Sequence, residues 1–322
     1  MSKVLLEVED LHTFFFTRRG VVKAVDGISF YVREGETFGL VGESACGKTV
    51  TALSILRLLP EPAGRIVAGK VVFDGTNLLE LDKKEMRAYR GREISMILQD
   101  PMTSLNPVYS IGDQIAEAVR MRHDLPDNMV EPEVISALRL LKIPSPETIL
   151  GEYPFQMSGG MRQRVVGAIA MSCRPRLLIA DEPTTALDAT IQAQYLALFK
   201  DVQKKTNISI IFITHDFGVV ANMCHRVGVM YAGKIVETAT TSELFKAPKH
   251  PYTVAMMDSV PRLDHKDKRL YSIKGQPPSL MNLPPGCRFY PRCSVATDVC
   301  RKREPHQVEI SDGHSVSCWR VQ

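Results

Sequence analysis

The segment Gly42-Glu43-Ser44-Ala45-Cys46-Gly47-Lys48-Thr49 decides the fold of this chain, because it fits the pattern G-x-x-x-x-G-K-[ST]. A short apolar run at residues 38–41 precedes it. Apolar residues at helical spacing follow over residues 49–59, until Pro60. The pattern predicts a strand, a tight loop and a helix in succession. The alternative is an ordinary glycine-rich turn, and the flanking strand and helix count against it.

A loop of this kind is suited to bind phosphate. Glycines let backbone N–H groups turn towards an anion, and the following helix directs the positive end of its dipole at the same place. We expect Lys48 to reach the β- and γ-phosphates of a nucleotide and Thr49 to bind Mg²⁺. The predicted nucleotide contacts are Gly42, Glu43, Ser44, Ala45, Cys46, Gly47, Lys48, Thr49 and Val50.

The composition describes an ordinary globular chain. It has 322 residues, of which 44% are hydrophobic and 24% charged, with a formal net charge of +4. These values exclude a disordered or fibrous chain and are too mildly basic to indicate nucleic acid. No apolar run is long enough to span a bilayer as a helix, and acidic residues interrupt the N-terminal apolar stretch. We therefore expect a cytosolic protein whose membrane role, if any, depends on partners.

A second candidate for the same chemistry lies at residues 177–182, an apolar run that ends in two acids. The end of a buried strand is where α/β sheets place their ligands. Asp181 would hold Mg²⁺ through water, and Glu182 is suited to be the general base for an attacking water. A solvated acidic strand end is the alternative, which the phosphate loop disfavours.

Apolar runs and helical patterns alternate along the chain, which is typical of an α/β fold with a mainly parallel sheet. The first 40 residues instead predict antiparallel strands, and a hairpin is expected around Ala232 and Gly233. Residues 100–160 predict a helical subdomain. Proline becomes frequent after residue 245, so we expect a nucleotide-binding domain over residues 1–245 and a loop-rich extension over residues 246–322.

Three further features complete a pattern. The segment 157–163 resembles the LSGGQ signature of ATP-binding cassette (ABC) ATPases, Gln99 follows an apolar strand, and His215 follows another. Taken alone, the signature segment could be an ordinary turn, Gln99 a surface residue and His215 a structural histidine. In this order along the chain, with the phosphate loop and Asp188, they make residues 1–245 resemble an ABC ATPase with the P-loop NTPase fold.

The resemblance implies a head-to-tail dimer that sandwiches ATP. Ser158, Gly159, Gly160 and Gln163 of one chain would then face the nucleotide of the other, with Asp188 at the dimer interface. His215 would contact the γ-phosphate, and Gln99 would bind Mg²⁺ or the attacking water.

The adenine contact and two departures from the family pattern concern the same predicted site. Counting back from Ala24, Phe15 is the expected adenine-stacking residue, with Phe14 and Phe16 as rivals. Met157 and Met161 replace the usual Leu and Gln of the signature. Ala45 replaces a usual Gly, at a cost on the order of 1 kcal/mol if that position needs positive φ.

Three longer segments resemble the oligopeptide and dipeptide importers. They are residues 99–107, His250-Pro251-Tyr252-Thr253 and Cys287-Arg288-Phe289-Tyr290-Pro291-Arg292-Cys293. The resemblance implies an ATPase subunit, peripheral at the cytoplasmic face of the cell membrane and docked on two permease subunits. It would pair with a second, usually different, ATPase subunit, although a homodimer is possible in isolation. An extracytoplasmic solute-binding protein would deliver the solute.

Other functions remain open at this stage. A nickel or metal-chelate importer uses the same type of ATPase, a soluble ABC ATPase acts on ribosomes or DNA, and a passive module holds ATP without hydrolysing it. The chain has one phosphate loop and no sustained heptads, which disfavours a soluble ABC ATPase. The presence of Glu182 and His215 disfavours a passive module.

Four of the seven cysteines fall in the last 36 residues, at Cys287, Cys293, Cys300 and Cys318. Their spacing, C-x5-C-x6-C-x17-C, lacks the close pairs of a typical zinc site. It suits an iron–sulfur cluster better, and the resemblance implies a 4Fe–4S cluster. Zinc and free or disulfide-linked thiols are the alternatives. We expect the cluster to stabilise the extension, with its charge offset by Arg288, Arg292, Arg301 and Arg303.

Overall fold

The computed structural model describes residues 3–99, 104–121, 125–185, 187–260 and 272–322. The chain divides into two compact units. The phosphate-loop unit comprises residues 6–31, 38–79 and 213–322, and the helical unit comprises residues 1–5, 32–37 and 80–212. The expected boundary near residue 245 and the helical subdomain over residues 100–160 stay predictions.

The phosphate-loop unit contains most of the strands. Its elements are β1 (Val4–Thr17), β2 (Gly20–Arg33), β3 (Thr37–Val41), α1 (Lys48–Ile55), β4 (Gly64–Phe73), β5 (Thr76–Asn77), α9 (Phe217–Met223), β9 (Arg226–Tyr231), β10 (Lys234–Thr240), α10 (Thr241–Lys246), α11 (Pro251–Asp258), η3 (Tyr290–Arg292), α12 (Asp298–Lys302), β11 (Val308–Ser311) and β12 (His314–Val316).

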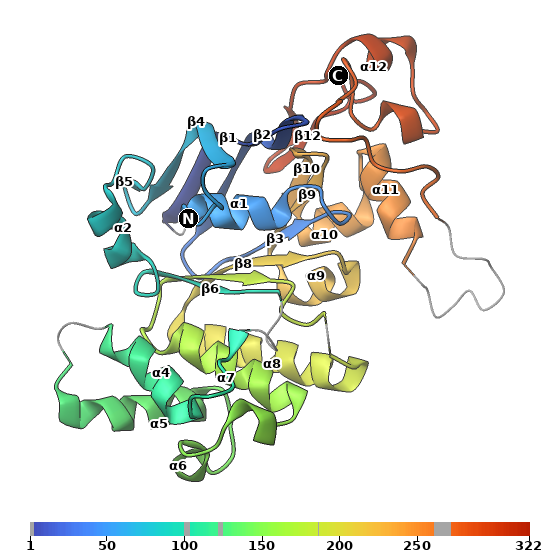
Figure 1. The fold of residues 1–322 in the computed structure, drawn as a ribbon. Coiled ribbons are helices and arrows are strands. Elements are labelled where there is room, and N and C mark those ends of the chain that lie inside the picture. The colour runs from blue at the N-terminus through green and yellow to red at the C-terminus, as the bar shows by residue number, and fades with distance from the viewer. Residues whose placement is uncertain (1–2, 100–103, 122–124, 186, 261–271) are drawn as a thin grey trace. The chain divides into compact units, whose positions relative to one another are not determined.

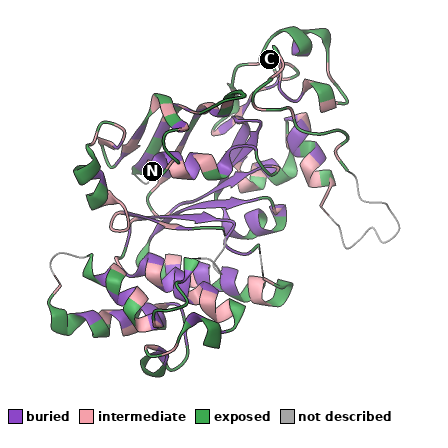
Figure 2. Ribbon diagram, in the orientation of Figure 1, coloured by how far each residue is buried: buried purple, intermediate pink, exposed green. Residues whose placement is uncertain are grey.

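Two strand arrangements build this unit (Figure 1). One has the order β2-β1-β4-β5, with β1 antiparallel to β4; the other has the order β11-β12-β10-β9-β3. Strand β3 runs parallel to β9, which pairs antiparallel with β10. Every residue of β3 and β9 is buried (Figure 2). The loop after β3 therefore starts from a strand that is held firmly on both faces.

The helical unit carries the segments that precede and follow the two acids. Its elements are α2 (Lys83–Tyr89), β6 (Ile94–Ile97), α4 (Ile111–Arg120), η1 (Asp127–Met129), α5 (Val130–Leu140), α6 (Pro146–Ile149), η2 (Pro154–Gln156), α7 (Gly159–Met171), β7 (Leu177–Asp181), α8 (Ala189–Thr206) and β8 (Ser209–Thr214). The strand order is β8-β7-β6, with β6 parallel to β7. Helices α4, α5 and α7 pack against one another (Figure 1).

The structure confirms the α/β class, the parallel core strands, the antiparallel strands near the N-terminus and the hairpin at Ala232 and Gly233. Helix α1 ends at Ile55, four residues before the expected end, and Arg57 takes a left-handed φ of 52°. Strands β11 and β12 were not expected, because each is too short to show an alternating pattern. Within the described part of the chain, no helix has the length and apolarity needed to cross a membrane.

Candidate nucleotide-binding and cysteine sites

Glycine is required at two positions of the phosphate loop because backbone atoms approach closely. A Cβ at Gly47, where φ is 113°, would lie 2.3 Å from the carbonyl oxygen of Ala24. A Cβ at Gly42 would lie 2.1 Å from the carbonyl oxygen of Met230. Ala45 adopts a positive φ of 61°. Its methyl group therefore carries the conformational cost, on the order of 1 kcal/mol, that was expected for a residue other than glycine at positive φ.

Lys48 is held inside the loop. It is the first residue of α1, and its Nζ donates hydrogen bonds to the carbonyl oxygens of Gly42 at 2.8 Å and Glu43 at 2.9 Å. Its side chain also lies 3.8 Å from the Cys46 sulfur, and burial raises the pKa of that thiol. The loop therefore holds the Lys48 ammonium against its own backbone, and the contact of Lys48 with the β- and γ-phosphates stays a prediction.

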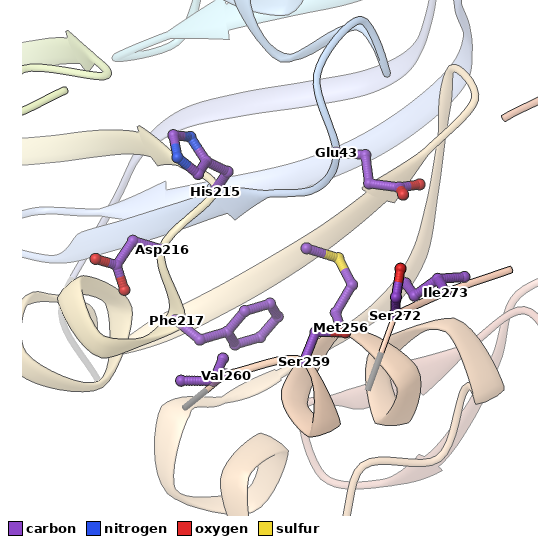
Figure 3. Close-up of a pocket in the computed structure, with 9 residues that line it drawn as sticks. All are labelled: Glu43, His215, Asp216, Phe217, Met256, Ser259, Val260, Ser272 and Ile273. Atoms are coloured by element: carbon purple, nitrogen blue, oxygen red, sulfur yellow. The ribbon is translucent and has the colours of Figure 1, made fainter. Parts of the chain in front are cut away.

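His215 and Glu43 face one pocket of the phosphate-loop unit (Figure 3). The pocket has a volume of about 510 Å³, and His215, which is exposed, lies directly after β8. Its described lining residues are Glu43, His215, Asp216, Phe217, Met256, Ser259, Val260, Ser272 and Ile273. The predicted γ-phosphate contact and the second residue of the phosphate loop thus border the same cavity.

The three phenylalanines near the end of β1 have different surroundings. Phe14 lies beneath Lys23, and Phe16 lies beneath Arg65. Phe15 is half-buried, and its cross-strand partner is Gly64, where a Cβ would stand 3.0 Å from the Phe15 ring. The glycine lets the Phe15 ring pack close to the neighbouring strand, and the adenine contact of Phe15 stays a prediction.

The carboxylates of the helical unit sit at the end of β7. Asp181 and Glu182 are 1% and 9% exposed, and Glu182 takes a left-handed φ of 46°. One oxygen of Glu182 accepts hydrogen bonds from the Gln99 amide at 3.2 Å and from the Thr185 hydroxyl at 3.0 Å. The structure therefore brings together two of the predicted catalytic side chains, Gln99 and Glu182. Residues 100–103 and Ala186, within the segments predicted around them, lie outside the described residues.

The signature segment begins helix α7. Ser158 is its N-cap, and a Cβ at Gly159 would meet nothing within 4 Å. The turn is exposed, and the expected contact of Ser158 and Gly159 in trans stays a prediction. Gln163 differs, because it is 1% exposed and donates to the carbonyl oxygen of Pro183. The predicted contact of Gln163 with a partner's nucleotide stays a prediction.

Asp188 has a local role that explains its position. It is the N-cap of α8, and its carboxylate accepts hydrogen bonds from the N–H groups of Thr190 and Ile191. It is also exposed, as an interface residue would be. Its place at a dimer interface stays a prediction.

Thr49, Gln99 and Asp181 are the predicted Mg²⁺ ligands. They offer hydroxyl, amide and carboxylate oxygens, which are the donors that Mg²⁺ prefers. The chemistry of this set fits the ion.

The four C-terminal thiols influence one another electrostatically. The pKa of Cys287 is raised to about 11, mainly by burial and to a smaller extent by the neighbouring Cys300 and Cys318. Burial and neighbouring thiols likewise raise the pKa of Cys293 and Cys318. Among the residues that the structure describes, however, no three His, Cys, Asp or Glu side chains are gathered tightly enough to hold a metal ion. The structure shows neighbouring thiols but no assembled ligand set.

Two of the four arginines expected to offset the charge of the thiolates and cluster form ion pairs with carboxylates, and the offset itself stays a prediction. Arg288 pairs with Asp26 and Glu304, and Arg292 pairs with Glu43, because these carboxylates lie within reach and the thiols carry no charge when protonated. Among the described residues, Arg320 is a cation that acts on two of the thiols: it lowers the pKa of Cys293 and Cys318 against the effect of burial. Its closeness to Cys318 in sequence was the available signal.

The His250–Thr253 segment has a structural explanation. His250 caps α11, and its Nδ1 accepts a hydrogen bond from the N–H of Tyr252. Burial lowers the pKa of His250 to about 3, so the ring stays neutral and able to accept. The carboxylate of buried Glu237 accepts from the N–H groups of Lys249 and His250.

Comparison with known families gives two matches. The model of the ABC transporter family matches residues 25–185, and the model described as oligopeptide/dipeptide transporter, C-terminal region, matches residues 236–300. Among solved structures, a dimeric ATP-binding cassette in a post-hydrolysis state with ADP and phosphate superposes with a TM-score of 0.65 at 20% identity. The match covers 74% of this chain and 99% of that one, and it shows the fold.

Curated relatives match along almost the whole length. The dipeptide transport ATP-binding protein DppD of Bacillus subtilis is 51% identical, over 99% of this chain and 95% of its own. The oligopeptide transport ATP-binding protein OppD of the same organism is 49% identical, over 98% and 88%. A probable peptide ABC transporter ATP-binding protein of Sinorhizobium fredii is 52% identical, over 99% and 96%. The chain therefore belongs to the ABC transporter family, within the branch of ATP-binding proteins that carry the oligopeptide/dipeptide transporter C-terminal region.

Proposed function

We propose that this chain binds and hydrolyses ATP to drive the import of dipeptides or oligopeptides through a membrane ABC transporter. One observation carries the proposal. Similarity to proteins named for peptide transport runs through both the phosphate loop and the C-terminal region, at 44–52% identity.

Each side chain of the proposed site has a role that its surroundings support. Lys48 and the N–H groups of the loop bind the β- and γ-phosphates, and Phe15 stacks on adenine. Glu182 accepts a proton from the attacking water. The Gln99 amide donates a hydrogen bond to the Glu182 carboxylate and thereby orients it. His215 contacts the γ-phosphate. Thr49, Gln99 and Asp181 would hold Mg²⁺, which would neutralise charge on the phosphates.

The remaining contacts come from a partner. Ser158, Gly159 and Gly160 at the start of α7 offer a hydroxyl and N–H groups to the nucleotide of the opposing subunit. The proposed assembly is a dimer with a second ATPase subunit, docked on two permeases at the cytoplasmic face of the membrane and served by an extracytoplasmic binding protein. No nucleic acid takes part.

Uptake of labelled solutes distinguishes the proposed function from its alternatives. Cells that lack the chain are expected to lose dipeptide uptake, and wild type but not Lys48→Ala should restore it. Loss of nickel uptake with normal peptide uptake would assign the chain to the metal importers instead. Normal uptake of both, with the chain bound to ribosomes or DNA, would favour a soluble ABC ATPase.

We also propose that the four cysteines hold a 4Fe–4S cluster. The wide and irregular spacing of the four thiols along the extension supports the proposal, as does the electrostatic effect of Cys300 and Cys318 on Cys287. Binding would displace the thiol protons, and the cluster would then stabilise the proline-rich extension.

Protein purified without oxygen is expected to contain about four iron and four acid-labile sulfide per chain. Cys293→Ser should lose iron and unfold at a lower temperature, because one ligand is gone. Cys173→Ser, outside the extension, is the matched control and should keep its iron. One zinc and no sulfide per chain would contradict the cluster and leave the transport function intact.

A further inference from the structure

An ion pair joins the cysteine-bearing extension to the phosphate loop. Both terminal nitrogens of Arg292 bond the carboxylate of Glu43, at 2.6 Å and 2.9 Å. The Arg292 side chain is 4% exposed and that of Glu43 28%. Arg292 also donates to the hydroxyl of Tyr231 and to the carbonyl oxygens of Ile273 and Lys274. The pair is bidentate and largely withdrawn from solvent, which makes it stronger than an exposed salt bridge.

Glu43 is held at three points of its structure. Arg292 binds its side chain, the Tyr252 hydroxyl accepts from its N–H at 2.8 Å, and Lys48 donates to its carbonyl oxygen at 2.9 Å. The first two holds come from the C-terminal part of the chain, and the third comes from the side chain expected to bind phosphate. The carbonyl oxygen of Glu43, together with that of Gly42, therefore helps to set where the Lys48 ammonium rests.

The segment that carries Arg292 is itself anchored. Phe289 is 3% exposed, and its ring lies 5.3 Å from that of Tyr231 and 5.4 Å from that of Tyr252, measured between centroids. Arg288 donates to the carbonyl oxygen of Ala232, and the next residue, Gly233, donates to the carbonyl oxygen of Cys46. Two arginines thus connect the segment at residues 287–293 to the phosphate loop. Arg292 does so directly at Glu43, and Arg288 does so through the β9–β10 turn, which bonds Cys46.

We propose that Arg292 is a positioning residue for nucleotide binding, which fixes Glu43 and thereby the phosphate loop and Lys48. The proposal rests on the proposed function, because it assumes that the loop binds ATP. Without Arg292, the Glu43 carboxylate loses its charged partner in a poorly solvated place and the loop becomes less ordered. Ordering it again on binding lowers nucleotide affinity.

A double-mutant cycle on the full-length chain tests the proposal. Affinity for the non-hydrolysable ATP analogue AMP-PNP, with Mg²⁺, is measured by calorimetry. Arg292→Met and Glu43→Ala should each weaken binding about tenfold, and the double variant should be no weaker than either, because both remove one interaction. Arg292→Lys should recover part of the affinity, since a point charge replaces the bidentate contact. Lys302→Gln, at an exposed lysine of the same extension, should bind as wild type does.

Two results would overturn the role of Arg292. One is independent effects, giving about a hundredfold loss in the double variant. The other is unchanged affinity in Arg292→Met with a lowered unfolding temperature, which would make the pair a structural contact only. If Arg292→Met does not fold, Arg292→Lys and Glu43→Ala decide the question by the same comparison. Failure of the wild type to bind AMP-PNP would contradict the proposed function itself, and the role of Arg292 with it.

Discussion

Glu182→Gln is expected to lower ATP turnover of the assembled transporter about 10²–10⁴-fold, because it removes the proposed general base. Glu182 is 9% exposed and already bonded by Gln99 and Thr185, so an amide of the same size should fit without displacing the strand end. Affinity for AMP-PNP should stay within a few-fold of wild type. Steady-state phosphate release and calorimetry measure the two quantities.

Glu131→Gln is the matched control for this variant. Glu131 is an exposed glutamate of α5 in the same unit, and its replacement should change neither quantity. Turnover of Glu182→Gln close to that of wild type would show that another group accepts the proton, or that the chain holds ATP passively.

Gly42→Ala should weaken nucleotide binding by about 100-fold, because misplacing a binding group by an ångström can cost that much. The added Cβ would lie 2.1 Å from the carbonyl oxygen of Met230 and 2.8 Å from the Cys46 sulfur. The first is a backbone atom of a fully buried strand, so no side-chain rotation relieves the contact. The loop must move, and Lys48, which bonds the Gly42 carbonyl oxygen, moves with it.

The control is Gly151→Ala, where an added Cβ meets nothing within 4 Å. It should bind AMP-PNP as tightly as wild type. Gly42→Ala should also lower the free energy of unfolding by about 1–3 kcal/mol, the usual cost of overpacking. Wild-type affinity in Gly42→Ala would contradict the placement of the nucleotide at this loop.

Local patterns explain why much of the fold was predictable. The phosphate loop, the acidic end of β7 and the β9–β10 turn each depend on residues close together in sequence. The turn residues Ala232 and Gly233 take φ values of 44° and 85°, which a two-residue hairpin requires. Such features can be read without knowing what packs against them.

Long-range contacts explain what the sequence left undetermined. Arg292 and Glu43 are 249 residues apart, and nothing near either indicates the other. The arginines were therefore assigned to the thiols beside them, whereas Arg288 and Arg292 bind carboxylates elsewhere in the fold. Likewise β12 pairs with β10 through only a few residues, too few to give a pattern.

Solute transport by purified components tests the central claim most directly. The chain, its partner ATPase and the two permeases are reconstituted in vesicles with ATP on the side of the ATPases, and labelled dipeptide is supplied with its binding protein on the other side. We expect dipeptide to accumulate with ATP, and not with AMP-PNP or with Glu182→Gln. ATP hydrolysis without any movement of peptide, or peptide movement that ignores ATP, would contradict the account.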